Sequence, residues 1–221
     1  MDVHTQSFLN NHPCFNKGAS VNWGRVHLPV APNCNIQCNF CNRMYDCANE
    51  NRPGVTQKVY TPDEAVAYLE KLFKDRQDIS VIGIAGPGDP MCDADKTLPT
   101  FEKCRARFPH LMLCLSTNGL ALPEHVDDIV RIGVSHVTVT VNAVTPSVGG
   151  KVYAWVRYNG KTYTGEEGAA ILLARQDEGI RKLKEAGMIV KINTVVIPGI
   201  NLDYVPQIAA KTKNGRPRSE E

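Results

Sequence analysis

Cysteines are the residues of this chain best suited to chemistry, and four of the eight lie in CNIQCNFCNRMYDC, residues 34–47. Cys34, Cys38 and Cys41 are spaced C-x3-C-x2-C, with Phe40 just before the third. Three thiolates this close on one loop can hold three irons of a [4Fe–4S] cube and leave the fourth iron open. Structural zinc sites are more often closed, four-coordinate and built from paired C-x2-C knuckles. The spacing therefore favours an iron–sulfur cluster over zinc, and structural cysteines least.

Other candidate groups fall where strands are expected to end. The turn GIAGPGDP, residues 83–90, has glycines that let the backbone approach a ligand. STNG, residues 116–119, and Asn142 occupy the same place after the next two apolar runs. Ligands of α/β folds bind at the carboxyl ends of the strands. We expect these turns to meet around one site, although the glycine turn alone could equally be an ordinary βα connection.

Short apolar runs alternate with helical patterns to position these groups. The runs lack clean alternation, as expected for strands covered on both faces, and the strands are predicted at 26–30, 79–85, 111–117, 136–142 and 189–197. Helices are predicted at 62–75, where Thr61 and Glu64 form a capping box, and at 98–108, 124–133 and 171–187. This order indicates parallel βαβ units in a βα barrel or an open α/β sheet. Five strands are fewer than the eight of a closed barrel.

Composition limits the class of protein. A chain of 221 residues can bury a core as one domain without disulfides, and a net charge of +2 gives no strong attraction to nucleic acid or anionic membrane. No apolar run approaches the ~18 residues that would span a bilayer. The N-terminus lacks the features of a secretory signal. We therefore expect a cytoplasmic protein whose clustered cysteines serve metals or redox chemistry.

The cysteine motif, the aromatic residue before its last cysteine and its place after the first strand resemble the radical S-adenosylmethionine superfamily. The resemblance implies a partial (β/α) barrel with a [4Fe–4S] cluster on Cys34, Cys38 and Cys41. S-adenosylmethionine would bind the open iron, and one electron would cleave it to a 5′-deoxyadenosyl radical. Asp89 would meet the methionyl amino group. The implied cofactor contacts are Gly86, Gly88, Asp89, Ser116, Asn118, Asn142 and Ile197.

Longer sequence segments narrow the resemblance to one family within this superfamily. HPC, VAPNCNIQCNFCNRMYDCANENRPGV, GIAGPGDP, LCLSTNGL and INTVVIPGIN look like the NifB family of nitrogenase cofactor maturases, from about His12 to Asn201. This implies that two substrate [4Fe–4S] clusters are fused with a sulfide and with a carbide drawn from the methyl group of S-adenosylmethionine. The implied product is an Fe8S9C precursor of the nitrogenase cofactor, made by combined lyase and transferase chemistry.

The same resemblance implies that Cys14, Cys47 and Cys114 hold a substrate cluster. Soft thiolates suit iron–sulfur clusters, and Cys114 lies on a predicted strand from which it could point into the barrel. A lone strand cysteine would otherwise be a small buried core residue. His12, two residues from Cys14, is a candidate ligand or proton shuttle, while His27 is expected to be structural.

Three further residues are less defined. Glu50 lies close to Cys47 and could act as a temporary ligand or proton acceptor, or be a solvated surface residue. Cys92 matches no motif, and Cys104 is expected to pack inside a helix. The family has a histidine-rich run after its HPC cysteine where this chain reads GASVNWGR, and no cysteine follows Cys114. Either the chain is shortened or, if it is complete, we expect it to hold the radical cluster and one substrate cluster.

The expected organisation has three parts. Residues 1–25 would fold over the barrel mouth, and residues 26–210 would form a radical SAM partial barrel, incomplete at its C-terminal side. An insertion at about 145–168 contains the Asn-Gly hairpin signal VRYNGKTY. The polar tail, residues 211–221, is expected to be disordered.

Three functions remain open from the sequence. They are a NifB-type maturase, another radical SAM enzyme of the molybdopterin-pathway or peptide-modifying type, and a shortened iron–sulfur carrier or scaffold. By resemblance, the partners would be a ferredoxin or flavodoxin as reductant, a scaffold donating [4Fe–4S] units and proteins that carry or assemble the nitrogenase cofactor. Neither nucleic acid nor a membrane is expected as a partner.

Overall fold

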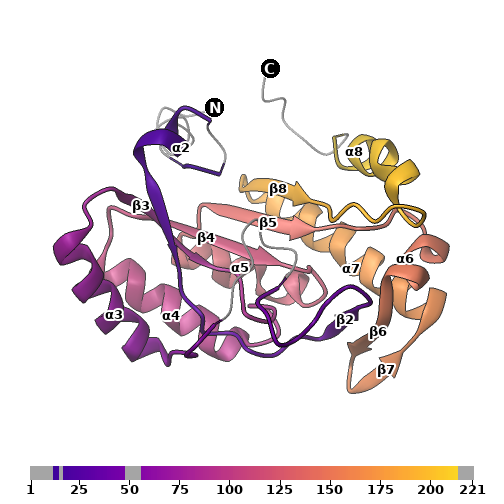
Figure 1. Cartoon of the computed structure of the whole chain (residues 1–221), viewed down its shortest axis with the longest axis horizontal. Helices are drawn as coiled ribbons and strands as arrows, with labels where there is room; N and C mark the ends of the chain where they lie inside the picture. The colour runs from indigo at the N-terminus through magenta and orange to yellow at the C-terminus, as the bar shows by residue number, and fades with distance from the viewer. Residues whose placement is uncertain (1–11, 15–16, 48–55, 214–221) are drawn as a thin grey trace.

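The computed structural model describes residues 12–14, 17–47 and 56–213. At its centre lies a five-stranded parallel sheet in the order β1-β3-β4-β5-β8 (Figure 1). This confirms the α/β fold class and the open arrangement expected for a partial barrel. The strands are β1 (Gly24–His27), β3 (Ile79–Ile84), β4 (Met112–Thr117), β5 (His136–Thr140) and β8 (Ile189–Asn193).

Each predicted strand is present, but the ends of all five differ from the prediction, those of β1 and β8 by the most. β1 begins at Gly24 and ends at His27, three residues short of the predicted Val30, because the Val30 N–H donates to the Leu28 carbonyl at 3.1 Å and not to β3. β8 ends at Asn193, four residues short of the predicted Ile197. Beyond Asn193, side-chain oxygens accept hydrogen bonds from the backbone in place of a neighbouring strand. The Val195 N–H donates to Asn142 Oδ1 at 2.9 Å, and the Ile197 N–H donates to Asn201 Oδ1 at 2.6 Å.

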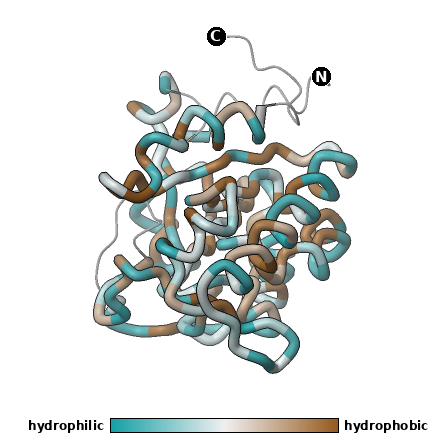
Figure 2. The backbone as a smooth tube through the Cα atoms, turned by 90° about the vertical axis from the view of Figure 1, so that its right-hand side faces the viewer, coloured by the Kyte–Doolittle hydropathy of each residue, from teal (hydrophilic) through white to brown (hydrophobic). Residues whose placement is uncertain are grey.

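Four helices cover one face of the sheet: α3 (Pro62–Asp75), α4 (Ala94–Arg107), α5 (Leu122–Ile132) and α7 (Gly165–Glu185). Alternate strand residues point toward them and form the main core, among them Val26, Ile82, Leu113, Val137 and Val190. Figure 2 shows hydrophobic segments along the strands and hydrophilic ones on the outer turns of the helices. Most of the apolar surface is therefore buried between the sheet and these helices.

The predicted helices are confirmed, with changes at their ends. α3 begins with the capping box, in which the Glu64 N–H donates to Thr61 Oγ1 at 3.3 Å and the Thr61 N–H donates to Glu64 Oε2 at 2.9 Å. α5 ends at Gly133, whose φ of +80° is favourable only for glycine. α4 starts earlier than predicted, at Ala94, because the Asp93 carbonyl already accepts from the Thr97 N–H. α7 likewise starts earlier, at Gly165.

The predicted hairpin is also confirmed. β6 (Tyr153–Tyr158) and β7 (Lys161–Tyr163) follow the short helix α6 (Pro146–Val152). Asn159 and Gly160, with φ of +49° and +73°, make the turn. β6 pairs antiparallel with β2 (Ile36–Cys38), so this hairpin lies directly beside the cysteine loop. The sequence did not reveal that pairing, which joins segments far apart in the chain.

The other face of the sheet carries a different set of side chains. Its residues alternate with those of the main core and are mostly polar: Arg25, His27, Gly83, Cys114, Ser116, His136, Thr138, Thr140, Lys191 and Asn193. We call this the open face. The short helix α2 (Ala19–Asn22), the 3₁₀ turn η1 (Leu202–Tyr204) and α8 (Val205–Lys213) lie away from α3 and α4. No helix in the described part of the chain is long and apolar enough to cross a membrane.

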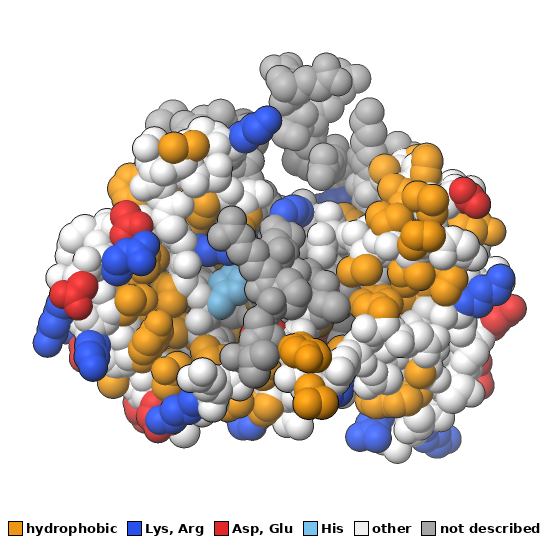
Figure 3. Space-filling view, in the orientation of Figure 1, with side chains coloured by type: hydrophobic (Ala, Val, Ile, Leu, Met, Phe, Trp, Pro, Cys, Tyr) orange, Lys and Arg blue, Asp and Glu red, His pale blue; other side chains and the backbone are white. Residues whose placement is uncertain are grey.

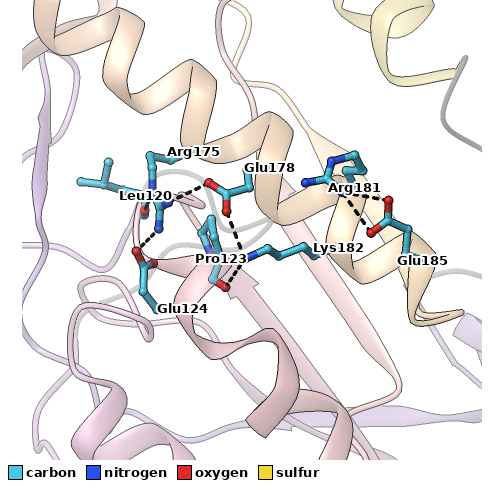
Figure 4. Close-up of polar contacts among 8 residues, drawn as sticks. All are labelled: Leu120, Pro123, Glu124, Arg175, Glu178, Arg181, Lys182 and Glu185. Carbon is cyan, nitrogen blue, oxygen red and sulfur yellow. Dashed lines mark hydrogen bonds and ion pairs between the residues drawn. The ribbon is translucent and has the colours of Figure 1, made fainter.

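Ion pairs fix α7 against the start of α5 (Figure 4). The Arg175 guanidinium donates to the Leu120 carbonyl at 3.2 Å and contacts the carboxylates of Glu124 and Glu178. Lys182 donates to the Pro123 carbonyl at 3.2 Å. The Arg175 side chain is only 12% exposed, so these contacts are less screened than ordinary surface pairs. These contacts of Arg175 help to position the neighbouring Gln176, which reaches the carboxyl end of β4.

Candidate functional site

The three cysteines of the predicted cluster line one cavity. Cys38 is buried at the end of β2, and Cys34 and Cys41 are half-buried to either side of that strand. The rest of the lining includes Cys47, Ala85, Gly88, Asp89, Ser116, Thr117, Asn118 and Thr140. The site therefore lies where the sequence placed it, at the carboxyl ends of β3, β4 and β5.

Hydrogen bonds from Gln37 close the cysteine loop. Its side-chain amide donates to the carbonyls of Cys38 and Cys41, both at 3.0 Å, and the Cys41 N–H donates to the Cys38 carbonyl at 3.0 Å. Arg43 donates to Gln37 Oε1 at 3.2 Å and to the Ile36 carbonyl at 2.6 Å. These contacts hold a guanidinium at the cavity wall. Sequence reasoning missed Arg43, although its place two residues after the last cysteine was a usable signal.

Electrostatics make this a poor place for isolated thiolates. Burial raises the pKa of Cys34 and, with the neighbouring charges of Cys34, Cys47 and Cys41, that of Cys38. Arg43 acts in the opposite direction on both. A positively charged metal centre would remove this cost, because coordination deprotonates a thiol outright. The donor set, three soft sulfur ligands at one half-apolar cavity, thus fits a [4Fe–4S] cluster.

The glycine turn approaches protein backbone rather than open space. The Gly88 N–H donates to the Ala31 carbonyl and the Asp89 N–H to the Asn33 carbonyl, both at 2.7 Å. A Cβ on Gly88 would overlap the Asn33 carbonyl oxygen. Gly86 lies near Cys47, whose Cβ would be 4.0 Å from an added methyl group. At Gly88 the missing side chain lets the turn clamp the segment leading into Cys34.

Asp89 is buried and heavily hydrogen-bonded. Its carboxylate accepts from Thr117 Oγ1 at 3.0 Å, from the Asn118 N–H at 2.5 Å and from the Met91 N–H at 3.0 Å. Burial raises the pKa of Asp89, and these bonds act against that rise. The carboxylate therefore joins the turn after β3 to the end of β4. It also borders the cavity, so a cofactor contact by this residue stays a prediction.

Asn118 reaches from the end of β4 to the cysteine loop. Its side-chain amide donates to Asn35 Oδ1 at 2.7 Å and approaches Cys34 Sγ at 3.6 Å. Its carbonyl accepts from Gln176 Nε2 at 2.7 Å, and Gln176 also donates to the Thr140 carbonyl at 2.9 Å. Gln176 was missed from the sequence. A polar residue within the buried stripe of α7, between Leu172 and Ile180, was the available signal.

Three of the predicted cofactor residues, Gly86, Asn142 and Ile197, are not among the residues that line the cavity. Asn142 follows β5, and its side-chain carbonyl accepts from the Val195 N–H, which fixes the segment after β8. Ile197 packs with the half-buried Cys34 and Cys41 against an apolar cluster centred on Ile36, Cys38, Leu120 and Leu172. The Tyr153 hydroxyl is buried beside the side chains of Asn142 and Gln176; burial raises its pKa, and hydrogen bonds from these two residues act against that rise.

A second group of candidate ligands lies on the open face. Strand register places His27, Gly83, Cys114 and His136 in one row across β1, β3, β4 and β5. The His27 ring lies over Gly83, where an added Cβ would be 2.7 Å from His27 Cδ2. His27 thus faces the same side as Cys114, and its predicted structural role stays a prediction. Ser116, two residues from Cys114 on the same face, borders the cavity.

The N-terminal candidates lie against the same face. The ring centroids of His12 and His136 are 4.2 Å apart, and the Cys14 N–H donates to His12 Nδ1 at 3.1 Å. The Arg25 guanidinium contacts Cys14 Sγ. Burial, together with the charges of His136, Arg25 and Lys191, lowers the pKa of His12 to about 3. His12 is thereby kept as a neutral imidazole, the form that binds metals.

The three cysteines predicted to hold a substrate cluster therefore lie in two separate places. Cys47 borders the cavity of the first three cysteines, whereas Cys14 and Cys114 lie farther down the open face. Among the described residues, no three His, Cys, Asp or Glu side chains converge tightly enough to hold a single metal ion.

The remaining cysteines are placed as follows. Cys104 is fully buried in α4, as expected for a packing residue, and burial raises its pKa to about 12. Cys92 is half-buried after the glycine turn, and burial together with the charge of Asp89 raises its pKa to about 12. Glu50 lies outside the described residues. Its predicted role as ligand or proton acceptor stays a prediction.

Comparison with known proteins identifies relatives. Residues 28–211 match the model of the Radical SAM superfamily. The FeMo cofactor biosynthesis protein NifB of Chlorobaculum tepidum is 47% identical over 201 residues, which cover 91% of this chain and 47% of that protein. The NifB protein of Sinorhizobium fredii is 49% identical over 201 residues, covering 91% and 41%. The chain thus spans about half the length of these relatives.

The fold has solved relatives. The structure of hexahistidine-tagged anSMEcpe with bound AdoMet superposes with a TM-score of 0.53 at 13% identity, covering 86% of this chain and 47% of that one. At this identity the likeness shows the fold alone. It agrees with the open parallel sheet and the one-sided layer of helices described above.

Proposed function

The chain belongs to the radical SAM superfamily, and we propose that it performs the cofactor maturation of its NifB relatives. In this proposal two substrate [4Fe–4S] clusters are fused with a sulfide and a carbide into an Fe8S9C precursor of the nitrogenase cofactor. The cavity shared by Cys34, Cys38, Cys41 and Cys47 carries the proposal. It combines a three-thiol cluster site with a further sulfur ligand, which general radical chemistry does not need.

The resident [4Fe–4S] cluster would supply the electron that cleaves S-adenosylmethionine. This chain's residues would hold and orient it. Cys34, Cys38 and Cys41 would ligate three irons, while Gln37 fixes the two carbonyls of the loop. Asn118 would donate to Cys34 Sγ, and Arg43 would balance the negative charge of the thiolates. Hydrogen-bonded in this way, the loop is pre-organised before any ligand arrives.

S-adenosylmethionine would lie above the strand ends. Gly86, Gly88 and Asp89 from the turn after β3, and Ser116 and Asn118 from the end of β4, surround or border that space. Asn142 and Ile197 would close it from the side of β8.

The substrate cluster would bind lower on the open face. We assign it to Cys14, Cys114 and Cys47, with His12 as a nitrogen donor beside Cys14. Ser116 lies on the same face two residues from Cys114 and borders the upper cavity, so the two sites share one side of the sheet. A methyl group activated at the upper cavity could therefore reach a cluster below. A scaffold donating [4Fe–4S] units and proteins carrying the product would act as partners.

Anaerobic reconstitution tests the proposal. Wild-type protein should bind more iron than one [4Fe–4S] cluster contains and convert S-adenosylmethionine to both 5′-deoxyadenosine and S-adenosylhomocysteine. A Cys34→Ala, Cys38→Ala, Cys41→Ala variant should retain a second paramagnetic signal, and a Cys14→Ala, Cys114→Ala variant should lose that signal while still forming 5′-deoxyadenosine. Formation of 5′-deoxyadenosine alone by wild type would indicate a different radical enzyme. Cluster transfer to an apo-acceptor without any cleavage would indicate a carrier.

A further inference from the structure

The small sheet β2-β6-β7 has one covered face and one outward face. On the covered face Ile36, Val156 and Tyr153 are buried with Leu172 of α7. The Arg175 guanidinium packs over the Tyr158 ring at 5.4 Å from the centroid, which further attaches β6 to α7. A register shift between Gln37 and Cys38 turns Tyr153 to the covered side. The residues between these, Gln37 and its neighbours on β6, therefore point away from α7.

The outward face carries arginine and aromatic side chains. Trp155 pairs in register with Gln37, and Arg157, two residues along β6, lies over the Trp155 ring at 5.3 Å from its centroid. Trp155 is half-buried and Arg157 is exposed. Arg43 donates to Gln37 and so extends this row to the cysteine loop. An unbroken line of side chains thus runs from the hairpin to the cluster ligands.

The charge on this part of the chain is of one sign. Between residues 132 and 165 the sequence contains Lys151, Arg157 and Lys161 but no aspartate or glutamate. All three basic residues are exposed. Figure 3 shows lysine and arginine side chains gathered over the tip of the β6–β7 hairpin. The next acids along the chain are Glu166 and Glu167, in the first turn of α7.

Apolar side chains are also exposed on the loop that follows Arg43. Met44 and Tyr45, which follow Arg43 directly, are 77% and 55% exposed. Methionine, tyrosine, tryptophan and arginine are the residue types enriched at protein interfaces. A solvated loop would more often carry polar residues here. The combination of exposed apolar groups with a basic rim is typical of a surface that a partner covers.

We propose that this face, formed by Arg43, Met44, Tyr45, Trp155, Arg157 and Lys161, docks a small acidic electron-carrier protein that reduces the cluster. The assignment rests on the cluster site proposed above at Cys34, Cys38 and Cys41. Positive charge selects an acidic partner and speeds its association. Gln37 bonds both to Arg43 and to the carbonyls of Cys38 and Cys41, so a carrier on this face lies next to the cluster ligands.

The chemical step is a single electron transfer. The carrier is oxidised by one electron and the bound cluster is reduced by one, with no bond made or broken in either protein. Electron transfer weakens steeply with distance, so the docked carrier must come close to the loop. The hairpin provides that approach because β6 pairs with β2, which itself contains Cys38.

Charge reversal on the hairpin tests the docking surface. The variant is Arg157→Glu, Lys161→Glu, and the matched control is Lys71→Glu, Lys74→Glu, which makes the same charge change on α3 at the other end of the molecule. Cluster reduction by a reduced acidic ferredoxin is followed by stopped-flow absorbance at several ionic strengths. We expect the hairpin variant to be reduced about tenfold more slowly at low salt, with a weaker salt dependence than wild type.

Two further measurements separate docking from damage to the site. Reduction by dithionite should be equal in all three proteins, and calorimetry with oxidised ferredoxin should show weaker binding to the hairpin variant even before iron is loaded. Equal ferredoxin rates in all three proteins, equal slowing in the α3 control, or equal slowing with dithionite would each overturn the docking surface. Normal cluster reduction without S-adenosylhomocysteine formation would instead contradict the proposed maturase and leave the docking surface intact.

Discussion

The side-chain amide of Asn118 lies 3.6 Å from the sulfur of Cys34, at the limit of an N–H···S hydrogen bond. The two residues are 84 positions apart and come together because β4 ends beside the cysteine loop. The Asn118 backbone is fixed in turn by Gln176 and by Asp89. One asparagine thus connects a cluster ligand to the end of a core strand and to the covering helix.

Removing this amide should lower the reduction potential of the cluster. Hydrogen bonds to the ligand sulfurs stabilise the more negative, reduced form. Asn118→Leu keeps the side-chain volume but loses the donor. A hydrogen bond contributes about 1 kcal/mol, which corresponds to about 40 mV for one electron. A potential titration followed by paramagnetic resonance should show a fall of that order. Asn39→Leu, whose amide bonds to the Lys151 carbonyl instead, should leave the potential unchanged.

Gly88 should be intolerant of any side chain. Because a Cβ there would overlap the Asn33 carbonyl oxygen, Gly88→Ala must displace the segment that leads into Cys34. Overpacking of this kind costs about 1–3 kcal/mol. We expect weaker iron binding after reconstitution and a lower urea midpoint. Gly24→Ala is the matched control, since its Cβ would meet Asp78 Oδ2 at an ordinary 3.5 Å. Equal iron content in the two variants would show that the clamp at Gly88 does not position the loop.

Local patterns predicted the fold well because its strands and helices follow from short-range chemistry. The capping box at Thr61, the glycine stop at Gly133 and the Asn159–Gly160 turn each act within a few residues, and each is confirmed. The triplet Cys34, Cys38 and Cys41 was predictable for the same reason, since its spacing is local.

The long-range contacts could not be predicted from the sequence. Nothing in the residues around Cys38 indicates that β2 pairs with β6, or that Gln176 on α7 reaches the end of β4. The end of β8 was misplaced because Asn142 and Asn201, distant in sequence from one another, replace its ladder with side-chain bonds. The sequence likewise does not show that Gly83 leaves space for the His27 ring.

Asp89 should stabilise the protein in the absence of any cofactor. Its carboxylate accepts from Thr117, Asn118 and Met91, and Asp89→Asn would place an amide N–H against one of these donors. A buried donor left without an acceptor costs about 1–3 kcal/mol. Urea unfolding of unloaded protein should show a loss of that size, with Asp95→Asn on the exposed start of α4 as control. An unchanged free energy of unfolding, with loss of S-adenosylmethionine binding alone, would assign Asp89 purely to the cofactor.

His136 makes the stability of the fold depend on pH. The side chain is fully buried at the start of β5, and burial lowers its pKa from 6.5 to about 4. Between these two values the unfolded chain binds a proton that the folded chain does not. Stability from the neutral imidazole is therefore complete above pH 6.5 and is lost as the pH falls toward 4. Its Nδ1 lies 2.8 Å from Ser135 Oγ, so the neutral ring has a local partner.

Replacing this histidine should flatten the acid side of the stability curve. Between pH 7 and pH 5, His136 should account for a loss of about 2 kcal/mol, since each pH unit below the unfolded pKa costs about 1.4 kcal/mol. Between pH 7 and pH 5 the free energy of unfolding of His136→Asn should therefore fall by about 2 kcal/mol less than that of wild type. Urea unfolding of unloaded protein at the two pH values measures both changes. The absolute stability of the variant does not enter this comparison, because each protein is referred to its own value at pH 7. His110→Asn, at an exposed position, should keep the wild-type slope. A variant that retains the full slope would show that other groups, and not the imidazole in the row with Cys114, set the acid sensitivity of the sheet.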